Sequence, residues 1–142
     1  MIETRKIEQV EELEVYQLFF DLAAEVENVT KKFEADFRWL RGQLLRASES
    51  VCANLTEGFY SQYSTEYLQA LYRCRREARE TMTHLRYAMK VCVLSDKICA
   101  VLLERYTDGL KQLGKLIGSI ENKIRERGKS KGQIVAPPST DH

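Results

Sequence analysis

The chain has 142 residues, 44% of them hydrophobic and 30% charged, which is enough for one domain and a short tail. Its formal net charge of +1 hides an uneven distribution, because residues 1–36 carry −6 while residues 61–93 and 94–142 carry +3 each. Every apolar run is interrupted by a charge and the first residues lack an apolar core, which argues against a membrane span and a secretory signal. We therefore expect a cytoplasmic protein.

Four segments place apolar residues at alternating steps of three and four, the seam of a left-handed helical bundle. They predict helices at about residues 10–32, 36–60, 65–93 and 96–127, with Ser64 and Ser95 as the N-caps of the last two. Both prolines lie beyond residue 136, and the connections are short. The expected fold of residues 1–127 is all-α, an antiparallel up-down-up-down four-helix bundle, followed by a flexible basic, proline-containing tail at residues 128–142.

The second segment contains the stretch SVCANLTEGF, in which Asn54, Glu57 and Gly58 interrupt the apolar seam. A helix C-cap would explain Gly58 but not the other two residues. We interpret Asn54 and Glu57 as members of a polar network that fixes the register and the oligomer geometry, rather than as a catalytic site. The partners expected for this network are Gln43, Arg46, Arg75 and Glu80.

Glycine also interrupts the fourth segment, at Gly109, Gly114 and Gly118. Each glycine costs roughly 1 kcal/mol of helix propensity relative to alanine. Gly114 and Gly118 share one face, where a neighbouring helix or subunit is expected to approach closely.

Residues suited to catalysis are sparse. Glu77, Glu80 and His84 share one helical face, but a di-metal bundle needs a Glu-x-x-His pair on two helices, and the second histidine is the terminal His142. There is no glycine-rich phosphate loop. We therefore expect no enzyme activity, no metal and no cofactor. The four cysteines are widely spaced, and we interpret them as reduced, mostly structural thiols: Cys52, Cys74, Cys92 and Cys99.

Basic residues gather on the third predicted helix, and such cations on a rigid helix attract a phosphate backbone. The candidate nucleic-acid contacts there are Arg73, Arg75, Arg76, Arg79, Arg86 and Lys90. Further candidates are Arg38 and Arg41 on the second helix and, at the end of the fourth, Lys123, Arg125 and Arg127. The alternative is an ordinary solvated helix face with internal ion pairs.

Three stretches resemble one known family: LEVYQLFFDLAAEVENVTKKF, LRGQLLRASESVCANLTEGF and STEYLQALYRCRREARETMTHLRYAMKVCVLS. They are similar to the four-helix-bundle proteins related to 23S ribosomal RNA intervening sequences, a superfamily that includes the accessory variability determinant proteins of diversity-generating retroelements. The most specific match is the second-helix signature, which here comprises Ser50, Val51, Asn54, Glu57 and Gly58. The usual proline of this signature is replaced by Cys52.

This resemblance implies a homo-oligomer, commonly a pentameric barrel, without catalytic activity. Its accessory branch implies binding to a reverse transcriptase and to RNA through basic helix surfaces. We therefore predict a non-enzymatic, oligomeric RNA-binding accessory protein. The alternative is a structural or protein-interaction bundle of the same family with no direct nucleic-acid role, in which the acidic first helix pairs with the basic third helix of another subunit.

Overall fold

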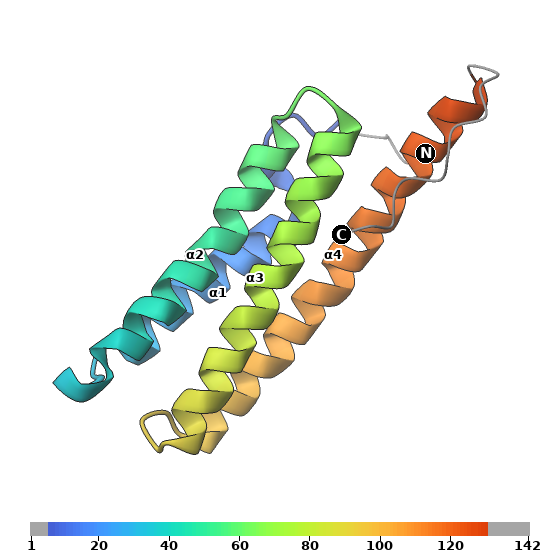
Figure 1. Ribbon diagram of the computed structural model, residues 1–142. Helices are drawn as coiled ribbons and strands as arrows, with labels where there is room; N and C mark the ends of the chain where they lie inside the picture. The colour runs from blue at the N-terminus through green and yellow to red at the C-terminus, as the bar shows by residue number, and fades with distance from the viewer. Residues whose placement is uncertain (1–5, 131–142) are drawn as a thin grey trace.

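The computed structural model describes residues 6–130, and this part of the chain is helical without a strand. The helices are α1 (Glu14–Thr30), α2 (Arg38–Phe59), α3 (Ser64–Lys90) and α4 (Asp96–Ser130). Short 3-10 helices precede α1 and α2, at Val10–Glu12 and Ala35–Phe37. Figure 1 shows the four long helices packed lengthwise into an elongated bundle. The predicted all-α, four-helix class is confirmed, and no helix of residues 6–130 is long and apolar enough to cross a membrane.

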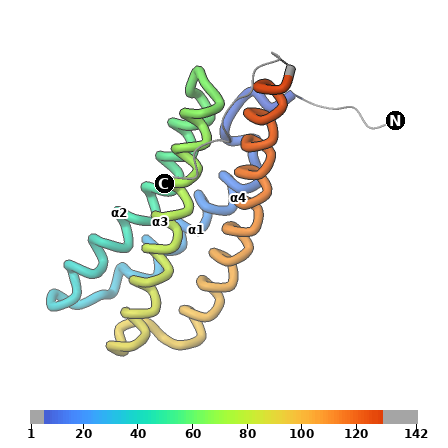
Figure 2. The backbone as a smooth tube through the Cα atoms, turned by 45° about the vertical axis from the view of Figure 1, so that its right-hand side comes forward, coloured from blue at the N-terminus to red at the C-terminus, as the bar shows by residue number. Residues whose placement is uncertain are grey.

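Each long helix packs against two others: α2 on α1 and α3, and α4 on α3 and α1. The residue pairs along the α2–α3 seam show how these two helices meet. Trp39, near the start of α2, contacts Tyr87, near the end of α3, whereas Gly58 at the end of α2 lies against Ala70. Figure 2 shows the same arrangement from another side, with the α2–α3 turn and the α3–α4 turn at opposite ends of the bundle.

Several helix boundaries differ from the predicted ones. The first two predicted helices each begin with a 3-10 turn, so α1 starts at Glu14 and α2 at Arg38. The third ends at Lys90, because Cys92 adopts a left-handed backbone with φ of 65°. The fourth continues to Ser130, and the rest of the predicted tail, residues 131–142, lies outside the described residues.

One of the two predicted N-caps is wrong. Ser64 is the first residue of α3, and Tyr63 precedes it as the N-cap, with its backbone N–H donating to the Glu66 carboxylate at 3.3 Å. Ser95 acts as predicted at α4, because its hydroxyl accepts the backbone N–H of Ile98 at 3.2 Å.

The core is built from the four apolar stripes, with Phe19 of α1 and Tyr106 of α4 fully buried and their ring centroids 6.0 Å apart. A Cβ on Gly109 would stand 2.7 Å from the Phe19 ring, so this glycine lets the ring pack on α4. A Cβ placed on Gly114 or Gly118 would meet no other helix of the described chain within 4 Å. Among residues 6–130 of one chain, the close approach expected at those two glycines is therefore absent and occurs at Gly109 instead.

Candidate nucleic-acid interface

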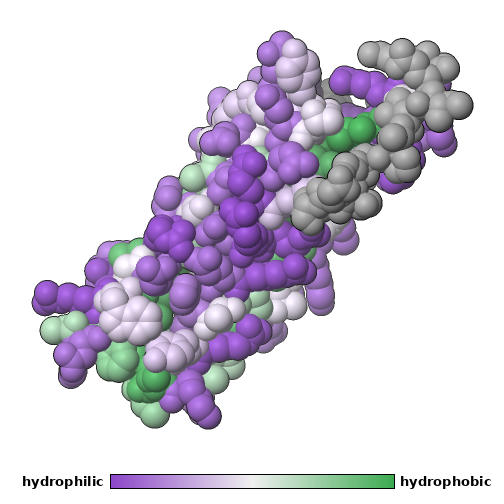
Figure 3. Space-filling view, in the orientation of Figure 1, coloured by the Kyte–Doolittle hydropathy of each residue, from purple (hydrophilic) through white to green (hydrophobic). Residues whose placement is uncertain are grey.

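The outer face of α3 carries a shallow groove rich in arginine, which we call the α3 groove. It arises because Leu71, Cys74 and Ala78 point into the core, which turns the arginines of this stretch of α3 outward. The groove has a volume of about 470 Å³ and is lined by Gln69, Tyr72, Arg73, Arg75, Arg76 and Arg79. In Figure 3 the most hydrophilic surface of the view lies over the middle of the bundle, where α3 runs.

Two arginines of the α3 groove have no ion pair with residues 6–130. The Arg75 guanidinium lies over the Tyr72 ring, 5.1 Å from its centroid, in a cation–π contact that leaves its charge unneutralised. Arg79 is exposed, one turn further along α3. These two cations are therefore available to an anionic ligand.

Tyr72 is held in place by α4. Its hydroxyl donates a hydrogen bond to the Glu121 carboxylate at 2.7 Å. Burial, supported by this hydrogen bond and by the Glu121 charge, raises the pKa of Tyr72 to about 12. The hydroxyl therefore stays protonated near neutral pH and keeps the ring under the Arg75 guanidinium.

The other two arginines of the α3 groove are occupied by neighbouring side chains. Arg73 donates to the Asn54 oxygen at 3.0 Å and to the Glu57 carboxylate at 3.1 Å. Arg76 lies 3.6 Å from the Glu77 carboxylate. Arg73 thus links α2 to α3, a role that the sequence analysis gave to other residues.

The remaining basic candidates are spread over the molecule. Arg86 and Lys90 continue the exposed face of α3 towards its end. Arg38 is exposed at the start of α2, whereas Arg41 pairs with Glu27 of α1 at 2.9 Å and so joins two helices. Figure 1 shows that the last turns of α4 lie at the other end of the bundle from the end of α3, and those turns carry the exposed Lys123, Arg125 and Arg127.

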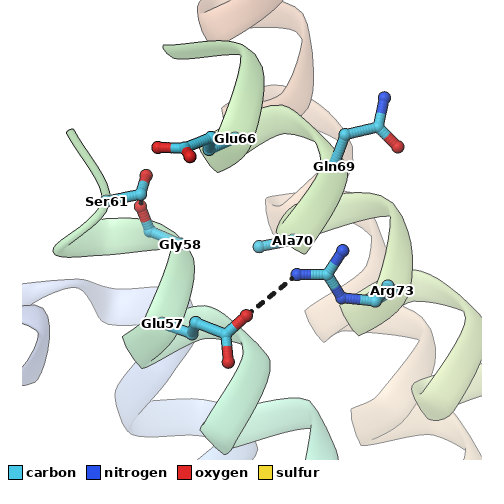
Figure 4. Close-up of a pocket in the computed structure, with 7 residues that line it drawn as sticks. All are labelled: Glu57, Gly58, Ser61, Glu66, Gln69, Ala70 and Arg73. Carbon is cyan, nitrogen blue, oxygen red and sulfur yellow. Dashed lines mark hydrogen bonds and ion pairs between the residues drawn. The ribbon is translucent and has the colours of Figure 1, made fainter. Parts of the chain in front are cut away.

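The polar residues of the α2 signature meet α3 in one cluster (Figure 4). The Asn54 amide nitrogen donates to the backbone oxygen of Ser50 at 2.9 Å and to its hydroxyl at 3.1 Å, while its oxygen accepts from Arg73. Asn54 is half-buried, but the Glu57 side chain is 74% exposed. Asn54 and Glu57 therefore meet α3 in one polar cluster, but their partner there is Arg73 rather than any of the four residues predicted.

Three of the four predicted partners, Gln43, Arg46 and Glu80, form a second, separate cluster. Arg75 does not belong to it and instead contacts Tyr72. Arg46 of α2 reaches across to α3, where its guanidinium pairs with the Glu80 carboxylate and lies 3.6 Å from the buried Glu77 carboxylate. Gln43 accepts from Arg46 at 3.3 Å, and Glu80 lies 3.7 Å from the His84 imidazole. Sequence reasoning placed the Arg46 and Asn54 clusters in one network because it could not assign the register of α2 against α3.

Gly58 lies inside α2 rather than capping it. A Cβ there would stand 2.6 Å from the Ala70 Cβ and 3.0 Å from the Tyr67 ring, so the glycine allows the two helices to approach. Beside it lies a pocket of about 450 Å³ between the end of α2 and the start of α3. Figure 4 shows the side chains that line it. Its lining includes the Glu57–Arg73 pair.

Other groups give little basis for catalysis. In the part of the chain that the structure describes, no group of three His, Cys, Asp or Glu side chains could hold a metal ion, and Glu77 turns to Arg46 rather than joining Glu80 and His84. Burial raises the pKa of the Cys52 and Cys74 thiols to about 12, which keeps them protonated and unreactive. Cys92 is exposed, and none of the four cysteines forms a disulfide.

Sequence reasoning missed one exposed feature. Trp39 of α2 and Tyr87 of α3 lie side by side, with ring centroids 5.8 Å apart and exposed fractions of 54% and 45%. Each residue was visible in the sequence as an aromatic near a helix end. Their contact depends on the register of α2 against α3, which no local pattern reveals.

Four packed helices with an arginine-rich outer face on α3 define a helical-bundle protein with a basic surface groove. The family model of the 23S rRNA-intervening sequence protein matches residues 11–115, and the chain belongs to that family. This confirms the predicted family, and the matched range includes α2, α3 and the α3 groove. A comparison with curated proteins gave no match.

Proposed function

We propose that this chain is a non-enzymatic, oligomeric accessory protein of the cytoplasm that binds RNA through the outer face of α3. The observation that supports it most is the α3 groove, where Arg75 and Arg79, which form no ion pair with residues 6–130, line the same surface as Tyr72. Fixed cations on a rigid helix bind phosphates by releasing condensed counterions and without contacting bases. Arg86 and Lys90 extend the same face.

The proposed assembly is a homopentamer of antiparallel up-down-up-down bundles. Its proposed protein partner is a reverse transcriptase of the kind that belongs to diversity-generating retroelements. Chains of this kind are expected to be encoded beside a reverse transcriptase and to co-purify with it when both are expressed together. A neighbourhood without such a gene, or two proteins that separate completely on a sizing column, would contradict the partnership. Light scattering of the full chain measures the subunit number directly.

RNA binding is tested by measuring the affinity of the full chain for a structured RNA over a range of salt concentrations. Affinity is expected to fall steeply with salt, and the double variant Arg79→Glu, Arg86→Glu is expected to bind at least tenfold more weakly, with a log–log salt slope reduced by about two. The matched control is Lys111→Glu, Lys115→Glu, the same charge change at exposed positions of α4. Equal loss in both variants, or no binding at low salt, would refute the RNA-binding role.

A second candidate is a structural bundle whose acidic α1 meets the basic α3 of another subunit. It is favoured by the exposed face of α1, where Phe20 is 56% exposed and stacks on Tyr16 with ring centroids 5.5 Å apart. In that case Arg79→Glu, Arg86→Glu would dissociate the oligomer, high salt would do the same, and RNA would not bind at any salt concentration. The same binding and light-scattering measurements therefore separate the two candidates.

A further inference from the structure

The exposed aromatic pair Trp39 and Tyr87 is distinct from the core aromatics. Phe19 and Tyr106 are fully buried, whereas Trp39 and Tyr87 are 54% and 45% exposed. The two rings are tilted by 59° with centroids 5.8 Å apart, so they are not stacked face to face. Aromatic faces left open in this way can take a third ring by stacking.

Space is open beside the pair. Gly42 lies one turn after Trp39 on the exposed side of α2, and a Cβ placed there would meet no atom of residues 6–130 within 4 Å beyond its neighbours and its own helical backbone. Gly42 therefore adds no side chain to the open surface one turn from the indole.

Exposed cations lie near the pair along both helices. Lys90 lies one turn after Tyr87, Arg86 precedes Tyr87, and Arg38 precedes Trp39; all three are exposed, and none forms an ion pair with residues 6–130. Arg79, in the α3 groove, is eight residues before Tyr87, or about 12 Å along the helix axis. One RNA strand can therefore contact the α3 groove and reach the aromatic pair.

We propose that Trp39 and Tyr87 stack the bases of unpaired RNA while Arg86 and Lys90 hold its phosphates. This inference rests on the proposed RNA-binding role and names the class of RNA that this face prefers. Proteins that bind single strands combine a basic track with aromatic rings that stack successive bases. In a duplex the base faces are covered by their neighbours, so a duplex can use the cations but not the rings.

Trp39 is the single tryptophan of the chain, and its fluorescence therefore reports on this site alone. The experiment titrates the full chain with a short oligouridine or oligoadenosine, with an RNA duplex of equal length, and with inorganic polyphosphate. The single strands are expected to quench Trp39 emission and the other two to bind without quenching. Trp39→Ala and Tyr87→Ala are each expected to weaken single-strand binding about tenfold and leave duplex binding and the salt slope unchanged.

The matched control is Tyr63→Ala, an equally exposed aromatic at the α2–α3 turn, which is expected to keep full affinity. Circular dichroism checks that each variant folds, and the fluorescence of the unchanged chain gives a result that does not depend on any variant. RNA binding without quenching, with equal affinity for strand and duplex, would overturn this inference and leave the proposed function standing. No binding of any RNA would overturn both.

Two other occupants give distinct results, and each would overturn the inference. A blue shift of Trp39 emission with phosphatidylserine vesicles, and no response to RNA, would assign the aromatic pair to a membrane surface. A change of oligomer mass in Trp39→Ala would show that a second copy of the chain covers the pair.

Discussion

Gly58 of α2 lies so close to Ala70 of α3 that a Cβ on the glycine would stand 2.6 Å from the Ala70 Cβ. The atom it would meet belongs to a fully buried residue with no flexible end to move away. The α2 signature of the family thus ends in a glycine for a packing reason, because a larger residue would force the two helices apart where they converge on their turn.

We expect Gly58→Ala to lower the free energy of unfolding by about 1–2 kcal/mol. Overpacking of a tight contact typically costs about 1–3 kcal/mol, and the better helix propensity of alanine returns up to about 1 kcal/mol. Urea unfolding followed by circular dichroism measures the difference. The control is Gly114→Ala on α4, where nothing lies within 4 Å and a gain of about 0.5–1 kcal/mol is expected. A stabilised Gly58→Ala variant would show that the contact is looser than described.

The architecture was predictable because it depends on local, repeated signals. Apolar residues at three- and four-residue steps define four helices, and residues such as Phe19 and Leu71 of those stripes are buried in the structure. The end of α3 was not predictable, because Cys92 has no intrinsic preference for the left-handed backbone it adopts. Glycine would have signalled that end.

The candidate site was predictable as a helix face but not as a set of contacts. The spacing of Arg75 and Arg79 placed them on one outer face of α3. Whether an arginine is neutralised depends on the facing helix: Arg73 meets Asn54 and Arg41 meets Glu27, at sequence separations of 19 and 14 residues. Such pairs follow from the register of one helix against the next, which the periodicity of either helix alone does not determine.

Arg73 makes two bonds of unequal expected strength, and double-mutant cycles separate them. The cycle of Asn54→Ala with Arg73→Ala is expected to give a coupling of about 1 kcal/mol, since its bond is half-buried and short. The cycle of Glu57→Ala with Arg73→Ala is expected to give less than about 0.5 kcal/mol, because the Glu57 side chain is 74% exposed. In molar salt only the Glu57 coupling should vanish. Equal couplings that both disappear in salt would contradict this assignment.

Stability is expected to fall in alkaline solution. Burial raises the pKa of Cys52 and Cys74 from 9.0 to about 12, and that of Tyr67 from 10.0 to about 12. The unfolded chain releases these protons at lower pH than the folded chain, so raising the pH favours unfolding. The stabilisation is complete below about pH 9 and is lost progressively between about pH 9 and pH 12.

Urea midpoints measured across that range under reducing conditions test this expectation. The variants Cys52→Ala and Tyr67→Phe each remove one of the titrating groups and should each show a smaller alkaline loss than the unchanged chain. Stability that stays level up to about pH 11, or an identical loss in every variant, would rule out these buried groups as its source.

Cys92 stores backbone strain at the end of α3. Its φ of 65° lies in the left-handed region, and the turn it makes is closed by hydrogen bonds from its own N–H to the Met89 oxygen and from the Val93 N–H to the Ala88 oxygen, each 3.0 Å. For an L-residue other than glycine or asparagine this conformation costs roughly 1–2 kcal/mol. Its side chain is exposed, so little packing is lost when it is removed.

We therefore expect Cys92→Gly to raise the free energy of unfolding by about 0.5–1 kcal/mol, because relief of strain outweighs the extra entropy of glycine in the unfolded chain. Cys92→Val is the opposing control, since a β-branched residue is the least tolerant of positive φ and should destabilise the protein. Urea unfolding in a reducing buffer measures both variants. If glycine destabilised the chain as much as valine, the exposed thiol rather than the backbone would be the feature that this turn requires.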